Sequence, residues 1–297
     1  MNAAILIFSL LLLNIQLASM SEVPLYYGWF LEPEGERRIV QMASSYYDQL
    51  LEKPSAVREM LNNFKLEGNN SSALSSYFTR DGLDSSSSTL HVTAMFCGRG
   101  SVPECRPYME KPKLKPATGK EYRLEVIGFV ITPKTLGARI QLSSEQLDVW
   151  GQNDNKGETS SVNKCCSNLD LGENRTDAGD FQPIVGKGSR AHATLSCANG
   201  VSPVQTGYDL VAAVNCEEHC KNDSRYFSLS GARGRYYGNG EFAIYLDKPN
   251  FFNSRFVAYI NSDSIMSIRN GSTRFGLSWD MISVILLVTL TLRYRVL

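Results

Sequence analysis

The pattern of hydrophobic and polar residues predicts one strand and two helices near the N-terminus, followed by a strand-rich body. Residues 24–31 form an aromatic, apolar segment that is typical of a buried strand. Apolar side chains then recur at helical spacing within 36–51, and a second helix is expected over 55–64.

From residue 90 onward, short apolar or alternating segments bounded by turns predict a series of strands. They are expected over 90–96, 123–131, 138–142, 190–197, 226–230, 241–246 and 256–260. A helix over 203–214 is opened by Pro203. The polar stretch 151–181 has no periodicity and is expected to form a long surface loop. Because helices and strands mix without strict βαβ alternation, the predicted class is α+β.

Both ends of the chain carry patterns that are typical of targeting segments. An apolar run followed by small residues predicts a signal peptide at 1–20, although no Lys or Arg precedes the run. A second run follows Asn270-Gly271-Ser272 and a polar spacer, which predicts a C-terminal anchor signal over 269–297. A GPI-type signal is favoured; a short transmembrane anchor is the alternative, and a buried C-terminal helix is less favoured.

These end segments leave a single domain at 21–268. They predict entry into the secretory pathway and display on the extracellular face of the plasma membrane, held by a lipid anchor. Five glycosylation sequons also suit an extracellular surface: Asn69, Asn70, Asn174, Asn222 and Asn270.

Composition and charge narrow the class of substrate. The chain has 297 residues, a hydrophobic fraction of 43% and a net charge of zero, which are ordinary values for a globular protein with a core. With no net charge, long-range attraction of polyanionic nucleic acid is not the main driving force of binding. A small anionic substrate fits this balance better than a long duplex.

Seven cysteines behind a signal peptide predict disulfides with one thiol left over. Cys97 and Cys197 lie in apolar, strand-like segments and are expected to be buried hydrophobic residues. Among the other five, Cys165 or Cys166 is expected to pair with Cys216 or Cys220, the remaining connectivity staying open. A zinc site built from these cysteines and His219 is disfavoured because the spacing is not standard. No metal site is therefore predicted, and His219 is expected at the surface.

Two of the three histidines occur in the same short motif, His-x-Thr. His91 and Thr93 form the first copy, and His192 and Thr194 form the second. This repetition indicates an internal duplication. One copy alone would carry little information, since a single histidine in an apolar strand is usually a core residue.

The spacing of the motif has a geometric meaning. Residues at i and i+2 on a strand project from the same face, so each histidine points with its threonine. Two such strands side by side would present two imidazoles and two hydroxyls to one phosphoester. One imidazole can take a proton from water while the other protonates the leaving oxygen, and the hydroxyls can hold the phosphate oxygens. Neither step needs a metal.

Several segments besides the motifs resemble the 2H phosphoesterase superfamily, and specifically the catalytic domain of the myelin 2′,3′-cyclic nucleotide 3′-phosphodiesterases. The similar segments are 24–31, 131–142, 188–198 and 204–210, and the resemblance extends over 22–262 with the order preserved. It implies a bilobal α+β fold with two antiparallel sheets flanking a central cleft and with outer helices. It also implies hydrolysis of 2′,3′-cyclic nucleotides to 2′-phosphates, without a cofactor, by His91, Thr93, His192 and Thr194.

The resemblance further assigns residues that contact the substrate. Tyr26 and Phe96 match positions near the base, Arg190 matches a position near the phosphate, and Pro203 and Val204 match the loop over the site. Simple alternation would point Phe96 away from His91, so the strand is expected to end or bulge at this point.

The extra cysteines, the long loop and the anchor signal suggest a cell-surface relative of an intracellular enzyme family. Three functions remain open: hydrolysis of cyclic mononucleotides, processing of RNA ends that carry a 2′,3′-cyclic phosphate, and a non-catalytic binding or adhesion module on the same fold. The expected partners are the cyclic phosphate substrate and, through the C-terminal anchor, a membrane. No obligate protein partner is expected.

Overall fold

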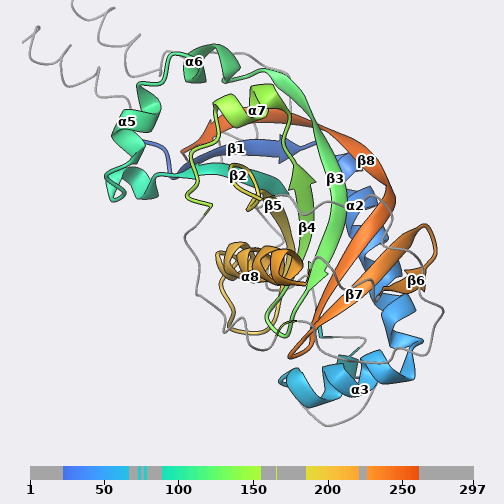
Figure 1. Cartoon of the computed structure of the whole chain (residues 1–297). Coiled ribbons are helices and arrows are strands. Elements are labelled where there is room, and N and C mark those ends of the chain that lie inside the picture. Colours follow the sequence, from blue (N-terminus) through green and yellow to red (C-terminus); the bar gives the residue numbers. More distant parts are fainter. Residues whose placement is uncertain are drawn as a thin grey trace, which may run out of the picture. The chain divides into compact units, whose positions relative to one another are not determined.

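The computed structural model describes residues 23–66, 73–74, 77–78, 89–154, 165, 185–220 and 226–260 (Figure 1). Its helices are α2 (Pro33–Leu51), α3 (Pro54–Asn63), the 3-10 turn η2 (Gly98–Gly100), α5 (Cys105–Met109), α6 (Leu114–Ala117), α7 (Ser144–Asp148) and α8 (Gln205–His219). Its strands are β1 (Tyr26–Leu31), β2 (His91–Phe96), β3 (Glu121–Ile131), β4 (Thr135–Gln141), β5 (His192–Cys197), β6 (Phe227–Leu229), β7 (Ala232–Gly238) and β8 (Glu241–Tyr259). The α+β class is confirmed.

The eight strands of the described residues belong to one antiparallel sheet, in the order β1-β2-β5-β4-β3-β8-β7-β6. Strand β1 also pairs with β8, so six of the strands close into a barrel. The expectation of two separate sheets is therefore wrong for the described residues. The reason is β8, which pairs with β3 and β1 and so joins the two halves into one ladder.

The two faces of the sheet are covered differently. On β3, Phe129 and Ile131 belong to the main core, which also contains buried residues of α2, whereas Val130 packs with Leu210 and Val214 of α8. Because neighbouring residues of a strand point to opposite faces, α2 and α8 lie on opposite sides of β3. Figure 1 shows α8 running across the face of β4 and β5, away from α2.

The strands expected over 241–246 and 256–260 are parts of a single strand, β8. The residues between them are largely polar and exposed, which hides the strand from a hydrophobic pattern. Their backbone nevertheless continues the ladder with β3, for example where Asn250 pairs with Val126. Strand β7 was not expected either, because it contains a buried arginine, Arg235, whose Nη2 donates to the backbone oxygen of Cys220 over 2.9 Å.

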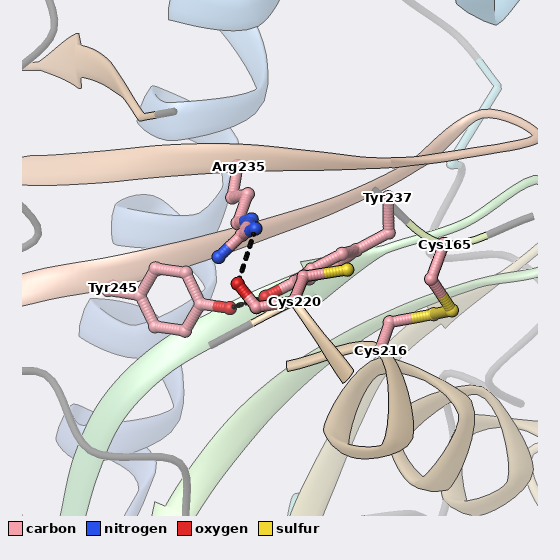
Figure 2. Close-up of a disulfide and its surroundings, with 6 residues drawn as sticks. All are labelled: Cys165, Cys216, Cys220, Arg235, Tyr237 and Tyr245. Atoms are coloured by element: carbon pink, nitrogen blue, oxygen red, sulfur yellow. Dashed lines mark hydrogen bonds between the residues drawn. A yellow bond between two sulfur atoms is a disulfide. The ribbon is translucent and has the colours of Figure 1, made fainter. Parts of the chain in front are cut away.

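Two disulfides join described cysteines. Cys165 bonds to Cys216 on α8, which confirms one of the expected pairings (Figure 2). Cys97 bonds to Cys105, so the expectation of a free Cys97 is wrong; the residue is buried, and only eight positions separate it from its partner. Cys197 is free and buried, as expected, and Cys220 is also disulfide-bonded.

The predicted signal peptide, the anchor signal at 269–297, the sequons and most of the 151–181 loop lie outside the described residues. Within the described part of the chain, no helix is long and apolar enough to cross a bilayer. The domain boundaries at 21 and 268 stay predictions.

The disulfides should differ in their contribution to stability, since a cross-link that closes a longer loop restricts the unfolded chain more. The Cys165–Cys216 bond spans 51 positions and the Cys97–Cys105 bond spans eight. Chain-entropy arguments give about 4 kcal/mol for the first and about 2.5 kcal/mol for the second. We expect the double replacement Cys97→Ala/Cys105→Ala to lower the free energy of unfolding by about 2.5 kcal/mol, measured by denaturant titration. An unchanged midpoint would contradict this expectation.

Candidate active site

Strands β2 and β5 lie side by side and bring the two His-x-Thr motifs together. Val92 of β2 pairs directly with Ala193 of β5, and both side chains are fully buried. One step along each antiparallel strand, His91 therefore lies across from Thr194, and Thr93 lies across from His192. All four project from the face opposite the core side chains. The two motifs are related by an approximate twofold axis through the central Val92–Ala193 pair.

A bulge follows each motif. On β2, Tyr27 pairs with Met95 but Gly28 pairs with Thr93, which leaves one extra residue on β2. Strand β5 has the same irregularity directly after Thr194, against β4. The bulge in β2 buries two consecutive side chains and turns Phe96 out to 46% exposure. The break in alternation expected at Phe96 is thus present.

The two imidazoles are oriented in the same way by the backbone. Nδ1 of His91 lies 3.0 Å from the carbonyl oxygen of Thr89, and Nδ1 of His192 lies 2.8 Å from that of Arg190. A carbonyl oxygen can only accept, so each Nδ1 carries the proton. Each neutral ring then has its lone pair on Nε2, the nitrogen that can take a proton from water or return one to a leaving group.

The environment favours the neutral form of both rings. Burial lowers the pKa of His192 to about 4; the hydrogen bond to Arg190 partly opposes this shift, and the charges of Arg190 and His91 add to it. Burial also lowers the pKa of His91, with the hydrogen bond to Thr89 opposing the shift. Because the paired strands bring the two rings to one face, charge on His91 also disfavours charge on His192.

The surroundings of the two histidines differ in spite of their similar backbone. The ring of His91 stacks on Tyr26 with centroids 4.7 Å apart and on Phe30 with centroids 5.1 Å apart. His192 instead lies beside the guanidinium of Arg190, which itself stands 5.0 Å above the ring of Tyr208. An aromatic face stabilises a neighbouring cation, whereas a guanidinium repels one.

The first turn of α8 forms part of the site. The hydroxyl of Thr194 lies 3.3 Å from the carbonyl oxygen of Pro203 and 3.0 Å from the hydroxyl of Thr206. A Cβ atom on Gly207 would lie 2.8 Å from Nε of Arg190. The helix backbone is therefore packed directly against the second motif. Val204, just before α8, is 57% exposed next to these residues.

The structure places the residues expected to bind the substrate near the two motifs, some in direct contact with them and some on adjoining positions of the chain. Phe96 ends β2, Arg190 lies in the turn that leads into β5, and Pro203 contacts Thr194 through its backbone. Tyr26 lies against His91 itself. Their contacts with a substrate stay predictions.

Four residues of the site were not identified from sequence: Thr206, Gly207, Glu36 and Asp154. The carboxylates accept hydrogen bonds from the backbone next to each motif, at Leu90 and at Arg190. Thr206 and Gly207 lie within 204–210, a segment that resembles the family, but no role was assigned to them from sequence. Among the described residues, no group of three or more His, Cys, Asp or Glu side chains is arranged to hold a metal ion.

Comparison with known proteins agrees with this geometry. The sequence model of the family described as 2′,3′-cyclic nucleotide 3′-phosphodiesterase matches residues 23–278. The 2′,3′-cyclic-nucleotide 3′-phosphodiesterase of Pongo abelii is 30% identical over 241 residues, which cover 80% of this chain and 50% of the relative. The enzyme of the same name from Mus musculus is 28% identical over 265 residues, covering 86% of this chain and 54% of the relative. The chain spans about half the length of these curated relatives. The chain belongs to the 2′,3′-cyclic nucleotide 3′-phosphodiesterase family.

Proposed function

We propose that this protein hydrolyses 2′,3′-cyclic nucleotide phosphates to 2′-phosphates by acid–base catalysis with two histidines and no metal. The observation that carries the proposal is the Val92–Ala193 pairing, which presents both His-x-Thr motifs on one face. Family membership supports the same reaction, since the relatives' name describes it. The cyclic phosphate would lie between the two imidazoles.

The different surroundings of the rings support an assignment of roles. Beside Arg190, His192 is disfavoured as a cation and suits the base that takes a proton from water. His91 has aromatic rings beside it in place of a guanidinium, so its protonated form is disfavoured by burial but not by a neighbouring charge of the same sign. Of the two histidines, His91 therefore suits the acid that protonates the departing 3′ oxygen. The bond from phosphorus to the water oxygen forms and the bond from phosphorus to O3′ breaks. The proton of the water goes to Nε2 of His192, and O3′ receives the proton from Nε2 of His91.

The threonine hydroxyls would bind the non-bridging oxygens as negative charge develops on them. Thr206 can support this role for Thr194: Oγ1 of Thr194 donates to Oγ1 of Thr206 over 3.0 Å, which holds the Thr194 hydroxyl in place, and the same proton can turn to a phosphate oxygen when a substrate binds. The exposed ring of Phe96 is available for the base.

A direct test uses the full chain with 2′,3′-cyclic AMP. We expect 2′-AMP rather than 3′-AMP as the product, at a rate that does not change when EDTA is added. Purified, folded protein that binds the nucleotide without converting it would support the binding or adhesion module instead. A rate many-fold higher with a short RNA that ends in a cyclic phosphate would assign the enzyme to RNA ends.

The pH dependence follows from the roles and the pKa shifts. A neutral His192 is required, so kcat/KM should rise with pH through its pKa of about 4. A protonated His91 is required, so kcat/KM should fall as the pH rises through the lowered pKa of His91. We therefore expect an optimum below pH 6.5, the usual pKa of histidine, and about a tenfold loss per pH unit on the alkaline side. An optimum above pH 7.5 would contradict the assignment.

We also propose that the protein acts in the secretory pathway and on the outer cell surface. Disulfide bonds persist in that oxidising environment, and the predicted targeting segments fit the same location. A GPI-type anchor would be cleaved by phosphatidylinositol-specific phospholipase C. Release of the protein from intact cells by that enzyme is the expected result; retention would favour a transmembrane anchor.

A further inference from the structure

Each motif histidine is held by a short chain of hydrogen bonds that ends at a carboxylate from another part of the fold. Nδ1–H of His91 donates to the carbonyl of Thr89, and the amide of the same peptide group, N–H of Leu90, donates to Oε1 of Glu36 over 2.9 Å. Glu36 comes from α2 and is buried, and both Thr89 and Leu90 are buried as well.

The second motif has a related arrangement. Nδ1–H of His192 donates to the carbonyl of Arg190, and the backbone N–H of Arg190 donates to Oδ1 of Asp154 over 3.1 Å. The other oxygen of Asp154 accepts from the backbone N–H of Gly188 at 3.0 Å and from the indole N–H of Trp150 at 2.9 Å. One carboxylate therefore fixes the turn that leads into β5.

We propose that Glu36 and Asp154 are positioning residues, each of which fixes the orientation and the tautomer of one catalytic histidine through the backbone. This proposal rests on the proposed function, in which both Nε2 atoms must face the phosphate, that of His192 with its lone pair free and that of His91 carrying the proton it gives to the leaving oxygen.

The physical effect differs slightly between the two arms. An N–H that donates to a carboxylate polarises its peptide group, so the carbonyl on the other side becomes a stronger acceptor. Glu36 acts in this way on the peptide between Thr89 and Leu90, and so strengthens the bond to His91. Asp154 bonds to the preceding peptide group and holds Arg190 in place, so that its carbonyl meets His192. Charged acceptors give hydrogen bonds roughly twice as strong as neutral ones.

Four variants of the full chain test the proposal: Glu36→Gln, Glu36→Ala, Asp154→Asn and Asp154→Ala. We expect each alanine variant to lower kcat for 2′,3′-cyclic AMP by about tenfold to about a hundredfold, since small displacements of a reacting group have effects of this size. The rise in KM should be smaller than the fall in kcat. The amide variants keep one acceptor oxygen and should show intermediate losses.

The decisive measurement is the ring tautomer, read from 15N chemical shifts of the imidazole nitrogens. The chain has only three histidines, so the signals can be assigned with single His→Gln variants. Replacing Glu36 should reduce the Nδ1–H form of His91 and leave His192 unchanged. Replacing Asp154 should reduce the Nδ1–H form of His192 and leave His91 unchanged. A purely structural role would not produce this selectivity.

Matched controls are available on the same segments. Glu34 is exposed on α2 and pairs with Arg37, and Asp148 is exposed on α7 and pairs with Lys113. Glu34→Gln and Asp148→Asn remove a carboxylate close in sequence without touching either motif. Both controls should keep wild-type kcat and both wild-type tautomers.

The outcomes separate this proposal from the proposed function. Unchanged kcat and tautomers in both alanine variants, or equal disturbance of both rings, would overturn the positioning role even if the wild type is active. An inactive wild type would refute the proposed function, while the tautomer measurement would still decide the role of the carboxylates. If an alanine variant does not fold, the amide variant at that position supplies the answer.

Discussion

Replacing either motif histidine by alanine is expected to lower kcat for 2′,3′-cyclic AMP by a factor of about 10² to 10⁴. This is the range in which a positioned acid or base contributes to catalysis. His192→Ala removes the group that takes a proton from water, and His91→Ala removes the group that protonates the departing oxygen. The measurement is steady-state hydrolysis near the acidic optimum.

His219→Ala is the matched control for these variants. His219 is the third histidine of the chain and ends α8, the helix whose first turn contacts the site. It should retain wild-type kcat and KM. The double variant of His91 and His192 should lose less than the product of the single losses, because the two residues act on one phosphorus atom. Full activity in either single variant would remove the basis of the proposed function.

Gly207→Ala is expected to reduce kcat by about tenfold to about a hundredfold while the protein stays folded. The new Cβ would lie 2.8 Å from Nε and 2.9 Å from Nη2 of Arg190, and 3.1 Å from Cε1 of His192. These are ends of side chains, so the guanidinium and the imidazole would shift while the helix stays in place. Alanine also favours the helical conformation by about 1 kcal/mol over glycine, which limits the loss of stability.

To separate an effect on catalysis from an effect on folding, kcat and the midpoint of thermal unfolding are both measured for the Gly207→Ala variant. We expect a large fall in kcat with a small change in the midpoint of unfolding. Thr206→Ser is the control at the neighbouring position. It keeps the hydroxyl that bonds to Thr194 and should keep most of the activity. A Gly207→Ala variant with normal kcat would mean that the approach of α8 to His192 does not matter for catalysis.

The local features of this fold were accessible from sequence, whereas its closure was not. Alternation predicted β2 and β5, and the paired motifs predicted that their polar faces would meet. The resemblance placed Phe96 in the site, so the strand was expected to end or bulge there; the structure has a bulge between Thr93 and Met95, directly before Phe96. Closure into a barrel depends on β8, whose polar middle residues give no hydrophobic signal, although β8 pairs with β3 on both sides of a register shift between Tyr245 and Asn250.

The parts of the site that sequence did not reveal act through the backbone or through space. Glu36 and Asp154 meet amide groups rather than side chains, and an isolated acidic residue in a helix or loop carries no motif. Gly207 contributes because it has no Cβ atom, which leaves room for the side chain of Arg190. Such roles depend on which segments meet in three dimensions, and a single sequence does not encode this in its local pattern.

Strand β8 also bears on how the chain assembles. Its last residues complete the ladder of a strand near the start of the chain, as where Tyr259 pairs with Tyr26, while its first half pairs with β3 and β7. Contacts between such distant parts of a sequence close slowly. During synthesis, the edge of β1 that pairs with β8 stays unpaired until nearly the whole domain has left the ribosome. Shortening the domain before Ser254 would leave that edge of β1 permanently open to strands of other chains, which favours aggregation.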